Sequence, residues 1–218
     1  MNRDNICYVT TVIMSQKRRT QAERVIETRG RLIAAALGVL REKGYAGFRV
    51  ADVTDAAGLS RGGQTHHFPT KLDLLLATFA WLYEQITERS RARLAQLKPD
   101  DDVVQQMLDD AAEFFLGEDF SIGLDLLAAA DRDPELREGI QRTAKENRFV
   151  VEDMWVGVLM SRGLSRSDAE DLLWLIFNSM RGLAVRSLWQ HDKKRFEHVK
   201  NLTLEIARER YAKIKRQS

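Results

Sequence analysis

The chain has 218 residues and a formal net charge of +2 at pH 7, and its 30% charged and 44% hydrophobic residues are ordinary for a water-soluble globular protein. It has only 3 prolines and 13 glycines and no long alternating runs of β-branched and aromatic residues, which excludes a β-sheet protein and favours helices joined by short turns. The single cysteine, Cys7, excludes an intramolecular disulfide framework and suits a reducing compartment.

Residues 1–22 are predicted to form a disordered basic leader. The apolar run from Ile6 to Met14 is too short to span a bilayer. Basic residues follow it directly at positions 17–19, without the small-residue pattern of a signal-peptide cleavage site. Either this leader is translated, or translation starts at Met14. In both cases we expect a cytoplasmic protein without a membrane partner.

The sequence next predicts four helices, of which the last is the longest. Apolar residues recur at helical spacing ahead of Gly44, which ends the first helix. Gly58 lies in the turn between the second and third helices, and Ser60 can cap the third. Pro69 breaks the third helix, and Thr70 can cap the long one. The predicted ranges are 24–43, 50–57, 61–67 and 71–97.

The rest of the chain is predicted to be helical throughout. Pro134 suits a first helical turn, and Ser167 with Glu170 three residues later forms a capping box. The predicted ranges are 102–117, 120–132, 134–162, 167–191 and 193–215. We therefore predict an all-α fold with one domain at residues 23–75 and a second at residues 76–218, linked by the long helix in place of a flexible tether.

Charge is divided unevenly along the chain. Residues 17–41 carry seven lysines and arginines against two glutamates, whereas residues 100–138 are rich in carboxylates. A basic front end on an acidic body indicates that the front end meets phosphates and the body does not. A solvated charged surface is the alternative, and charge alone does not exclude it.

Residues 50–67 have the features of a helix-turn-helix. Thr54 and Ala57 are small or β-branched, as the crossing of two short helices requires, and Gly58 tolerates the left-handed geometry of the turn. Leu59 then points back into the small core. The second helix can lie in the major groove of DNA, with its exposed face toward the base edges.

Several separate elements of this region resemble the DNA-binding domain of the tetracycline-repressor (TetR/AcrR) family. They are Gly44-Tyr45, Val50-x-Asp52-Val53, Ala57 to Gly62 and His66 to Lys71, in the family's order between Thr28 and Leu76. The resemblance implies an N-terminal three-helix helix-turn-helix domain. It also implies a long helix leading to a C-terminal helical bundle for ligand binding and dimerisation.

The resemblance also assigns DNA-contacting positions, with some departures. Arg49 stands where the family usually has Ser or Thr, and it offers a cation to a phosphate in place of a cap. Gln64 either pairs with an adenine or turns inward. Residues 17–19 can track a neighbouring minor groove. The predicted DNA-binding residues are Arg49, Ser60, Arg61, Gly62, Gly63, Gln64, Thr65, His66, His67 and Lys71, the last resembling the family's phosphate-contacting lysine.

Metal and catalytic sites are not expected. His66 and His67 are neighbours that do not converge on one zinc ion, and no cysteine or third histidine lies near them in sequence. Ser60 lacks the context of a nucleophile elbow. Nothing in the sequence indicates an enzyme, and no cofactor is predicted.

Large aromatic and methionine side chains recur at helical spacing in the C-terminal domain. Such residues mostly form a core, but a bundle rich in them can enclose a ligand cavity between its helices. In the resembled family, that cavity lies in this domain. The predicted lining residues are Phe115, Trp155, Phe177 and Met180.

The leading interpretation is a homodimeric repressor that responds to a small-molecule effector and binds a near-palindromic operator in double-stranded DNA. The resemblance implies that the last two helices pair with their copies, although their apolar stripe also fits an internal face. Ligand binding would shift the helix at 71–97 and change the separation of the recognition helices. The alternatives are a constitutive DNA-binding protein without an effector, and a helical enzyme, for which no catalytic cluster is visible.

Overall fold

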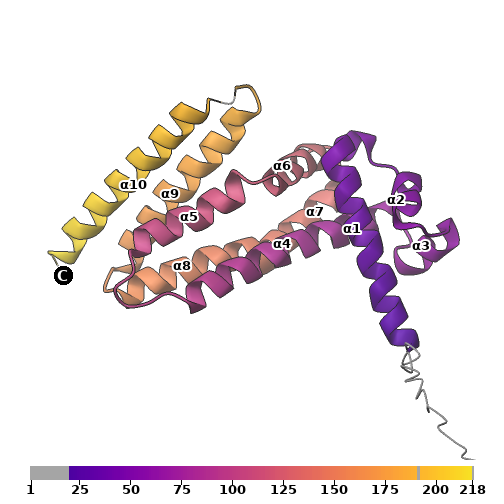
Figure 1. The fold of residues 1–218 in the computed structure, drawn as a ribbon, viewed down its shortest axis with the longest axis horizontal. Helices are drawn as coiled ribbons and strands as arrows, with labels where there is room; N and C mark the ends of the chain where they lie inside the picture. The colour runs from indigo at the N-terminus through magenta and orange to yellow at the C-terminus, as the bar shows by residue number, and fades with distance from the viewer. Residues whose placement is uncertain (1–19, 191, 218) are drawn as a thin grey trace, which may run out of the picture.

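The computed structural model describes residues 20–190 and 192–217, apart from the side chain of Arg61. Within these ranges every regular element is a helix and no strand occurs, so the predicted all-α fold is confirmed. The helices α1 (Gln21–Gly47), α2 (Val50–Ala57) and α3 (Arg61–His67) form a head at one end of the molecule (Figure 1). Residues 1–19 of the predicted leader lie outside the described residues, and its last two residues belong to α1.

Helix α1 begins at a capping box and ends in a kink. The Thr20 hydroxyl accepts a hydrogen bond from the Glu23 backbone N–H at 3.2 Å, which satisfies a donor that the first turn leaves unpaired. Gly44 has a φ of 63°, so the regular helix breaks there, as predicted, before one irregular turn. Buried side chains begin at Leu32, and the exposed N-terminal part of α1 projects beyond α2 and α3 (Figure 1).

Helix α4 (Lys71–Ala95) joins the head to the rest of the molecule, here called the body, as predicted. Its first turn is fixed by a capping box, in which the Thr70 hydroxyl accepts from the Asp73 backbone N–H at 3.0 Å. Along its length, α4 packs against α1 in the head and against α7 (Pro134–Thr143) and α8 (Phe149–Ser161) in the body.

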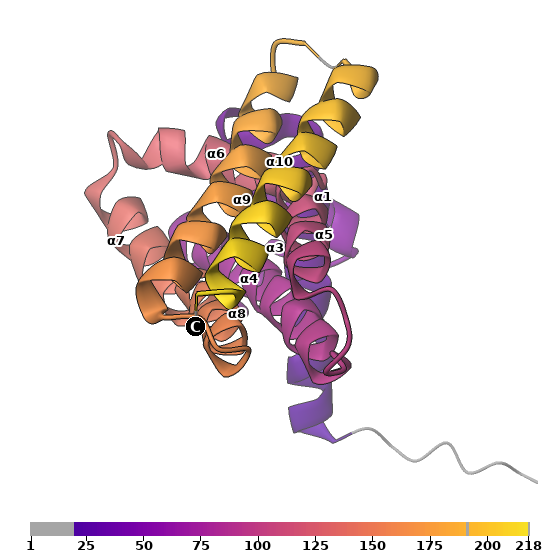
Figure 2. The same cartoon turned by 90° about the vertical axis from the view of Figure 1, so that its left-hand side faces the viewer.

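The body is a helical bundle around an apolar core that continues into the head. Its last two helices, α9 (Arg166–Ser187) and α10 (Lys193–Lys215), lie side by side (Figure 2) and pack against each other. The remaining helices are α5 (Val103–Phe115) and α6 (Asp119–Ala130), which connect α4 to α7. None of the helices in the described ranges combines the length and the apolar character that crossing a membrane needs.

The predicted continuous helix at 134–162 is interrupted. A π-helical turn, η1 (Ala144–Arg148), separates α7 from α8. Each N–H in such a turn bonds to the carbonyl five residues earlier, so the turn accommodates an extra residue that the ordinary 3.6-residue period does not reveal. Arg148 at the end of this turn is buried.

The predicted capping box of Ser167 with Glu170 is wrong. Ser165 is the N-cap of α9, with extended backbone angles, and its hydroxyl accepts from the Asp168 backbone N–H at 3.1 Å. The Glu170 carboxylate instead accepts a hydrogen bond from the Arg166 Nε at 2.7 Å. Two serines two residues apart both precede an acidic residue at the required spacing, and the backbone at Ser165 selects the first.

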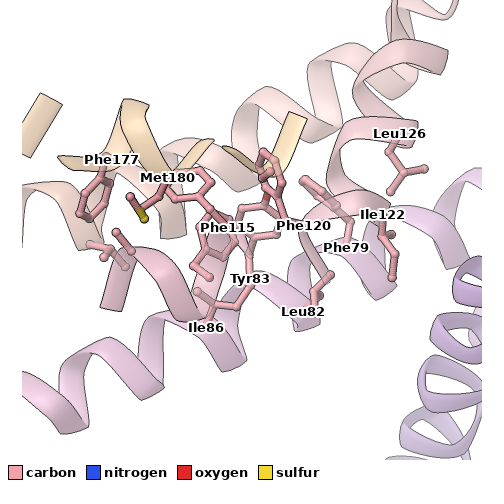
Figure 3. Close-up of a cluster of buried hydrophobic side chains, with 14 of the residues drawn as sticks. Phe79, Leu82, Tyr83, Ile86, Phe115, Phe120, Ile122, Leu126, Phe177 and Met180 are labelled. Atoms are coloured by element: carbon pink, nitrogen blue, oxygen red, sulfur yellow. The ribbon is translucent and has the colours of Figure 1, made fainter. Parts of the chain in front are cut away.

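Aromatic rings from four helices meet in the middle of the body (Figure 3). The rings of Phe115 and Phe120 lie edge to face with centroids 5.0 Å apart, and Phe177 stands 5.9 Å from Phe115 on its other side. Edge-to-face contacts align the positive edge of one ring with the negative face of the next. This cluster joins α4, α5, α6 and α9 into one packing unit.

One cation is buried within the aromatic cluster. The Arg148 guanidinium lies 4.6 Å from the ring centroid of Phe177 and 5.0 Å from that of Phe114, and its Nη2 is 3.2 Å from the Glu152 Oε1. Burial lowers the pKa of Arg148 to about 10, and the nearby Glu152 carboxylate opposes this change. Arg148 therefore stays charged at neutral pH, and the rings and the carboxylate offset part of its desolvation.

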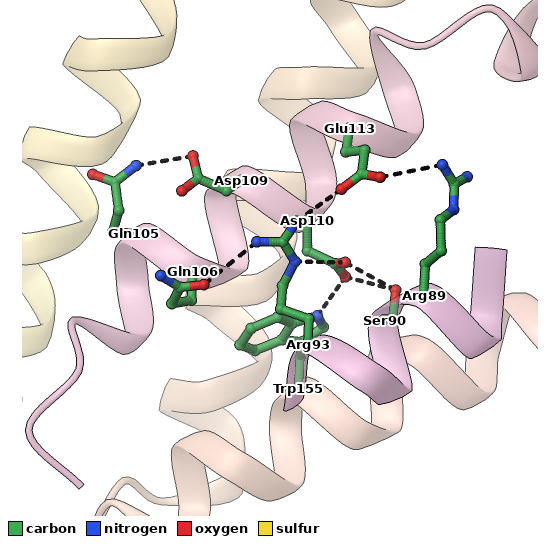
Figure 4. Close-up of polar contacts among 9 residues, drawn as sticks. All are labelled: Arg89, Ser90, Arg93, Gln105, Gln106, Asp109, Asp110, Glu113 and Trp155. Carbon is green, nitrogen blue, oxygen red and sulfur yellow. Dashed lines mark hydrogen bonds and ion pairs between the residues drawn. The ribbon is translucent and has the colours of Figure 1, made fainter. Parts of the chain in front are cut away.

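A second buried polar cluster joins α4, α5 and α8 (Figure 4). The Asp110 carboxylate accepts hydrogen bonds from the Ser90 Oγ at 2.8 and 3.0 Å and from the Trp155 Nε1 at 2.7 Å. The Arg93 Nε lies 3.4 Å from the same carboxylate. A buried carboxylate with this many partners holds its neighbours in fixed positions. The C-terminal half of α4 is thereby anchored to the bundle.

Candidate nucleic-acid interface

Helices α2 and α3 form the predicted helix-turn-helix. Gly58 ends α2 with φ 61° and ψ 40°, the left-handed conformation that a residue without Cβ adopts at low cost. Val53, Thr54 and Ala57 are buried beneath the turn. The Arg31 side chain donates a hydrogen bond to the Ala57 carbonyl, which satisfies an acceptor at the end of α2.

The Ser60 hydroxyl caps α3, as predicted, by accepting from the Gly63 backbone N–H at 3.3 Å. One face of α3 is open to solvent and carries Gly62, Thr65 and His66, while Gly63 is half-buried. A Cβ at Gly62 would meet nothing within 4 Å, so the fold itself does not require glycine at this position. A missing side chain there lets another molecule approach the backbone closely.

Gln64, a predicted DNA-binding residue, has its side chain turned away from the exposed face of α3. Its side chain is only 4% exposed, and its Nε2 donates a hydrogen bond to the Phe68 carbonyl. The physical reason is that the last carbonyls of a helix lack intrahelical partners, and a glutamine four residues earlier reaches one of them. Of the two predicted alternatives, the inward orientation is the one observed.

His66 and His67 have different surroundings. His66 is exposed, whereas His67 is half-buried, and their rings meet edge to face with centroids 5.3 Å apart. Burial, followed by the nearby His66 and Arg29, lowers the pKa of His67 below its ordinary value. His67 therefore carries less positive charge near neutral pH than an ordinary histidine does. No group of three or more metal-ligating side chains occurs among the described residues.

Lys71 and Arg49 are exposed cations of the head, at the starts of α4 and α2. Lys71 is exposed at the first position of α4, and its Nζ lies 4.9 Å from the ring centroid of Tyr45 and 5.6 Å from that of Phe48. These rings hold the ammonium group near the helix start without neutralising it. Arg49 is exposed at the N-cap of α2, where its guanidinium, which has no acceptor, cannot cap the helix. Arg61 begins α3.

Fewer cations at the basic front end are free to contact phosphates than the charge of this segment predicts. Arg41 forms an ion pair with Asp119 of α6 at 2.5 Å, and Lys43 pairs with Asp52 at 3.0 Å. Arg29 stacks on the Phe68 ring at 4.4 Å. Arg41, which the charge pattern placed among the cations that meet phosphates, is therefore paired with the acidic body. The predicted minor-groove arm at residues 17–19 lies outside the described residues.

Three residues of the head have roles that sequence reasoning missed. Arg31 and Arg29 support the turn and the end of α3, and Tyr45 carries the ring beneath Lys71 while donating its backbone N–H to Asp125 of α6. In the sequence, Tyr45 was noted only as part of the Gly44-Tyr45 motif of the family resemblance, without a role of its own. The partners of all three are distant in sequence, so no local pattern identifies these contacts.

The four predicted cavity-lining residues separate in the structure, although all four are buried. Phe115 lines a cavity of about 310 Å³ between α6 and the paired helices α9 and α10. Phe177 lines a smaller one of about 180 Å³ beside α8. Trp155 and Met180 line neither cavity, and Trp155 is held by Asp110. A ligand-binding role for these residues stays a prediction.

Comparison with known proteins identifies the same region. The model of the family described as bacterial regulatory proteins, tetR family, matches residues 32–78. The HTH-type transcriptional regulator CymR of Pseudomonas putida is 82% identical over 203 residues, which cover 93% of this chain and all of that protein.

Solved structures share the fold. A TetR-family regulator from Mesorhizobium loti superposes with a TM-score of 0.68 at 18% identity, over 84% of this chain and 96% of that one. A TetR regulator from Chloroflexus aurantiacus superposes with a TM-score of 0.63 at 27% identity, over 84% of this chain and 94% of that one. The likeness therefore extends beyond the head into the C-terminal bundle.

Proposed function

Because this chain belongs to the TetR family of bacterial regulatory proteins, we propose that it is a homodimeric, ligand-responsive repressor of transcription that binds a near-palindromic operator. DNA binding and transcriptional regulation come with the family. The observation that carries the proposal is the open face of α3, together with exposed cations at the starts of α2 (Arg49) and α4 (Lys71). A helix presented in this way fits the major groove, with positive charge over the phosphates on either side.

The structure supports a division of labour within this surface. His66 and Thr65 are exposed on α3 and can reach base edges, and Gly62 lets the α3 backbone come close to the DNA. Lys71 and Arg49 would contact phosphates, which position the head without reading sequence. With Gln64 turned inward, few side chains are left to read bases, so DNA shape contributes to selectivity.

Dimerisation is proposed through α9 and α10. On α10, Leu202 is 44% and Ile206 is 46% exposed, one helical turn apart, which leaves an apolar strip open to solvent. On α9, Gly182 is exposed and a Cβ there would meet nothing within 4 Å, so a second helix can approach closely. Leu172, Ile176 and Leu183 are buried within the protomer and belong to its own core.

Ligand response is proposed because the body has a partly open apolar cavity next to α6, a helix that contacts the head. The cavity lined by Phe115, of about 310 Å³, lies at the lower end of the size range of small-molecule sites, roughly 300–1,000 Å³. A molecule bound there and favouring one arrangement of the head would change operator affinity by its differential affinity for the two states.

Selection of bound duplexes from a random DNA pool tests the proposal. We expect enrichment of a two-fold symmetric sequence and a complex that contains two protomers. Enrichment of an unsymmetrical site would refute the dimeric operator. Equal recovery of all sequences, with affinity set only by salt, would favour a constitutive, non-specific DNA-binding protein.

A further inference from the structure

Two adjacent histidines end α3. His66 is exposed on the open face of the helix, and His67 next to it is half-buried. Their rings meet edge to face, with centroids 5.3 Å apart and planes at 76°. Histidine is the side chain whose charge ordinarily changes close to neutral pH, and a proton on one of two neighbouring rings disfavours a proton on the other. The two rings therefore titrate as one unit, here called the histidine pair.

Arg29 places a fixed positive charge beside this pair. It reaches across from α1, and its guanidinium carbon lies 4.4 Å from the ring centroid of Phe68, the residue that follows the pair. Burial lowers the pKa of His67, and the charges of His66 and Arg29 lower it further. These two, on α3 and on α1, are the charged groups that act on His67 among the described residues, and both oppose its protonation. In the protein without DNA, the pair is therefore held back from taking up a proton.

Two carboxylates on the elements next to α3 are engaged with other groups. At the start of α4, the Asp73 carboxylate accepts from the Thr70 backbone N–H at 2.9 Å and from its hydroxyl at 2.7 Å. On α2, Asp52 pairs with Lys43 at 3.0 Å. Lys71, also at the start of α4, adds a further exposed cation to the head. Neither carboxylate is thus a ready counter-ion for a proton on the histidine pair.

DNA brings such a counter-ion to the end of α3. The proposed docking puts the open face of α3, with His66 on it, into the major groove, whose edges are lined by phosphates. A negative charge within about 4–6 Å of an imidazole favours its protonated form. The head therefore binds a proton more readily on DNA than off it. Because such coupling is reciprocal, a higher proton concentration in turn strengthens the binding of DNA.

We propose that the histidine pair takes up a proton when the head binds DNA, so that operator binding tightens as the pH falls from about 7.5 to about 6. The proposal rests on the DNA binding put forward above and adds a condition that regulates it. A purely structural role of the pair predicts the opposite sign. Protonation of His67 destabilises the folded head, so a structural role would weaken operator binding at low pH.

Operator affinity is measured by fluorescence anisotropy across this pH range, on a duplex selected with the wild-type protein. The salt concentration is kept constant, because the affinity of proteins for DNA depends strongly on it. Calorimetric titration in two buffers with different enthalpies of ionisation counts the protons taken up on binding. Circular dichroism at each pH confirms that every variant is folded.

For the wild type we expect the dissociation constant to fall by at least about threefold from about pH 7.5 to about pH 6, with net proton uptake on binding. The double variant His66→Asn, His67→Asn is expected to lose both effects. His198→Asn is the matched control, because it removes an exposed histidine of α10 in the body, and it should behave as the wild type does. If the double variant does not fold, His66→Asn alone replaces it, since this change at an exposed position is expected to reduce the proton uptake.

Three results would overturn the proposal. They are an operator affinity that stays constant or weakens as the pH falls, wild-type pH dependence in the double variant, and loss of the pH dependence in His198→Asn, which would place the proton in the body. Failure of the proposed function gives a different result, since the wild-type protein would then select no operator from the random pool at any pH. The two failures are therefore distinguishable before any variant is compared.

Discussion

Lys71 and His66 lie on the same surface, and we expect them to act differently. Lys71 holds an exposed charge over Tyr45, whereas His66 stands on the open face of α3. Lys71→Ala is expected to weaken selected and random DNA alike and to lower the salt slope by about one phosphate contact. His66→Ala is expected to reduce the preference for selected over random DNA. Anisotropy titrations at several salt concentrations measure both.

Lys145 provides the control for this pair of variants. It is an exposed lysine at the π turn in the body, so Lys145→Ala is expected to bind both DNAs as the wild type does. Equal changes in preference from Lys71→Ala and His66→Ala would contradict the division between phosphate contact and base reading.

Gln64 is expected to contribute to stability and not to base selection. Its amide donates to the Phe68 carbonyl while buried, so Gln64→Ala leaves that acceptor without its partner. The expected loss is about 1 kcal/mol in the free energy of unfolding, measured by urea denaturation. The exposed Gln141→Ala is the control and should change stability by less than about 0.5 kcal/mol. A Gln64→Ala variant of unchanged stability but altered base preference would refute this assignment.

His67 makes the stability of the head depend on pH. Its pKa is lowered in the folded protein, chiefly by burial, so the unfolded chain binds its proton more readily. The free energy of unfolding therefore falls as the pH drops from about 6.5 toward the lower folded pKa, and levels off below it. His67→Asn is expected to remove this part of the pH dependence between pH 7.5 and 5.5 in urea denaturation. A wild-type slope in the variant would show that other groups cause it.

At the scale of elements, local signals predicted the head well. Gly58, Ser60 and Thr70 act on their own backbone within a few residues, so the turn and both caps could be inferred from the sequence. The sequence left the orientation of Gln64 open, because it does not show that the Phe68 carbonyl at the end of α3 needs a donor. The prediction of Ser167 as the cap of α9, where Ser165 is observed, was wrong because the two capping patterns overlap.

The body was predictable only as a set of helices. The π turn before Arg148 does not change the apolar pattern enough to be detected, and the contacts between helices join residues far apart in the chain. Aromatic residues predicted to line one cavity were therefore divided between the core and two cavities. Periodicity identifies which side chains turn inward but not where packing leaves space.

Asp110 is expected to be the most sensitive polar position of the body. Asp110→Ala leaves the buried Trp155 Nε1 and Ser90 hydroxyl without their acceptor, and it leaves the Arg93 guanidinium without its nearby carboxylate. The free energy of unfolding is therefore expected to fall by about 3 kcal/mol. Asp109→Ala is the control, because that neighbouring carboxylate is only half-buried and accepts from Gln105. Similar melting temperatures for the two variants would contradict an anchoring role for Asp110.

At the scale of the whole molecule, charge distribution was misleading in one respect. Arg41 and Asp119 are separated by 78 positions in sequence, yet they pair where the head meets the body. The distribution of charge along the sequence cannot reveal such a pair. Arg41 was therefore predicted to be among the cations available to DNA. Arg49 and Lys71, in contrast, are exposed.

Tight operator binding is expected to require dimerisation. Replacing the exposed Leu202 and Ile206 of α10 by glutamate puts like charges on the proposed interface. The doubly substituted protein is expected to be a folded monomer in sedimentation and to bind operator far more weakly, because the two heads no longer act together. A stable dimer in this variant would place the interface elsewhere.

The central claim is that two heads read one symmetric site, and a hydroxyl-radical footprint of the wild-type protein on a selected duplex tests it most directly. We predict two protected patches on one face of the duplex, related by two-fold symmetry and centred about one helical turn, roughly 10 base pairs, or a multiple of it apart. A single unsymmetrical patch, or uniform protection along the duplex, would contradict the account.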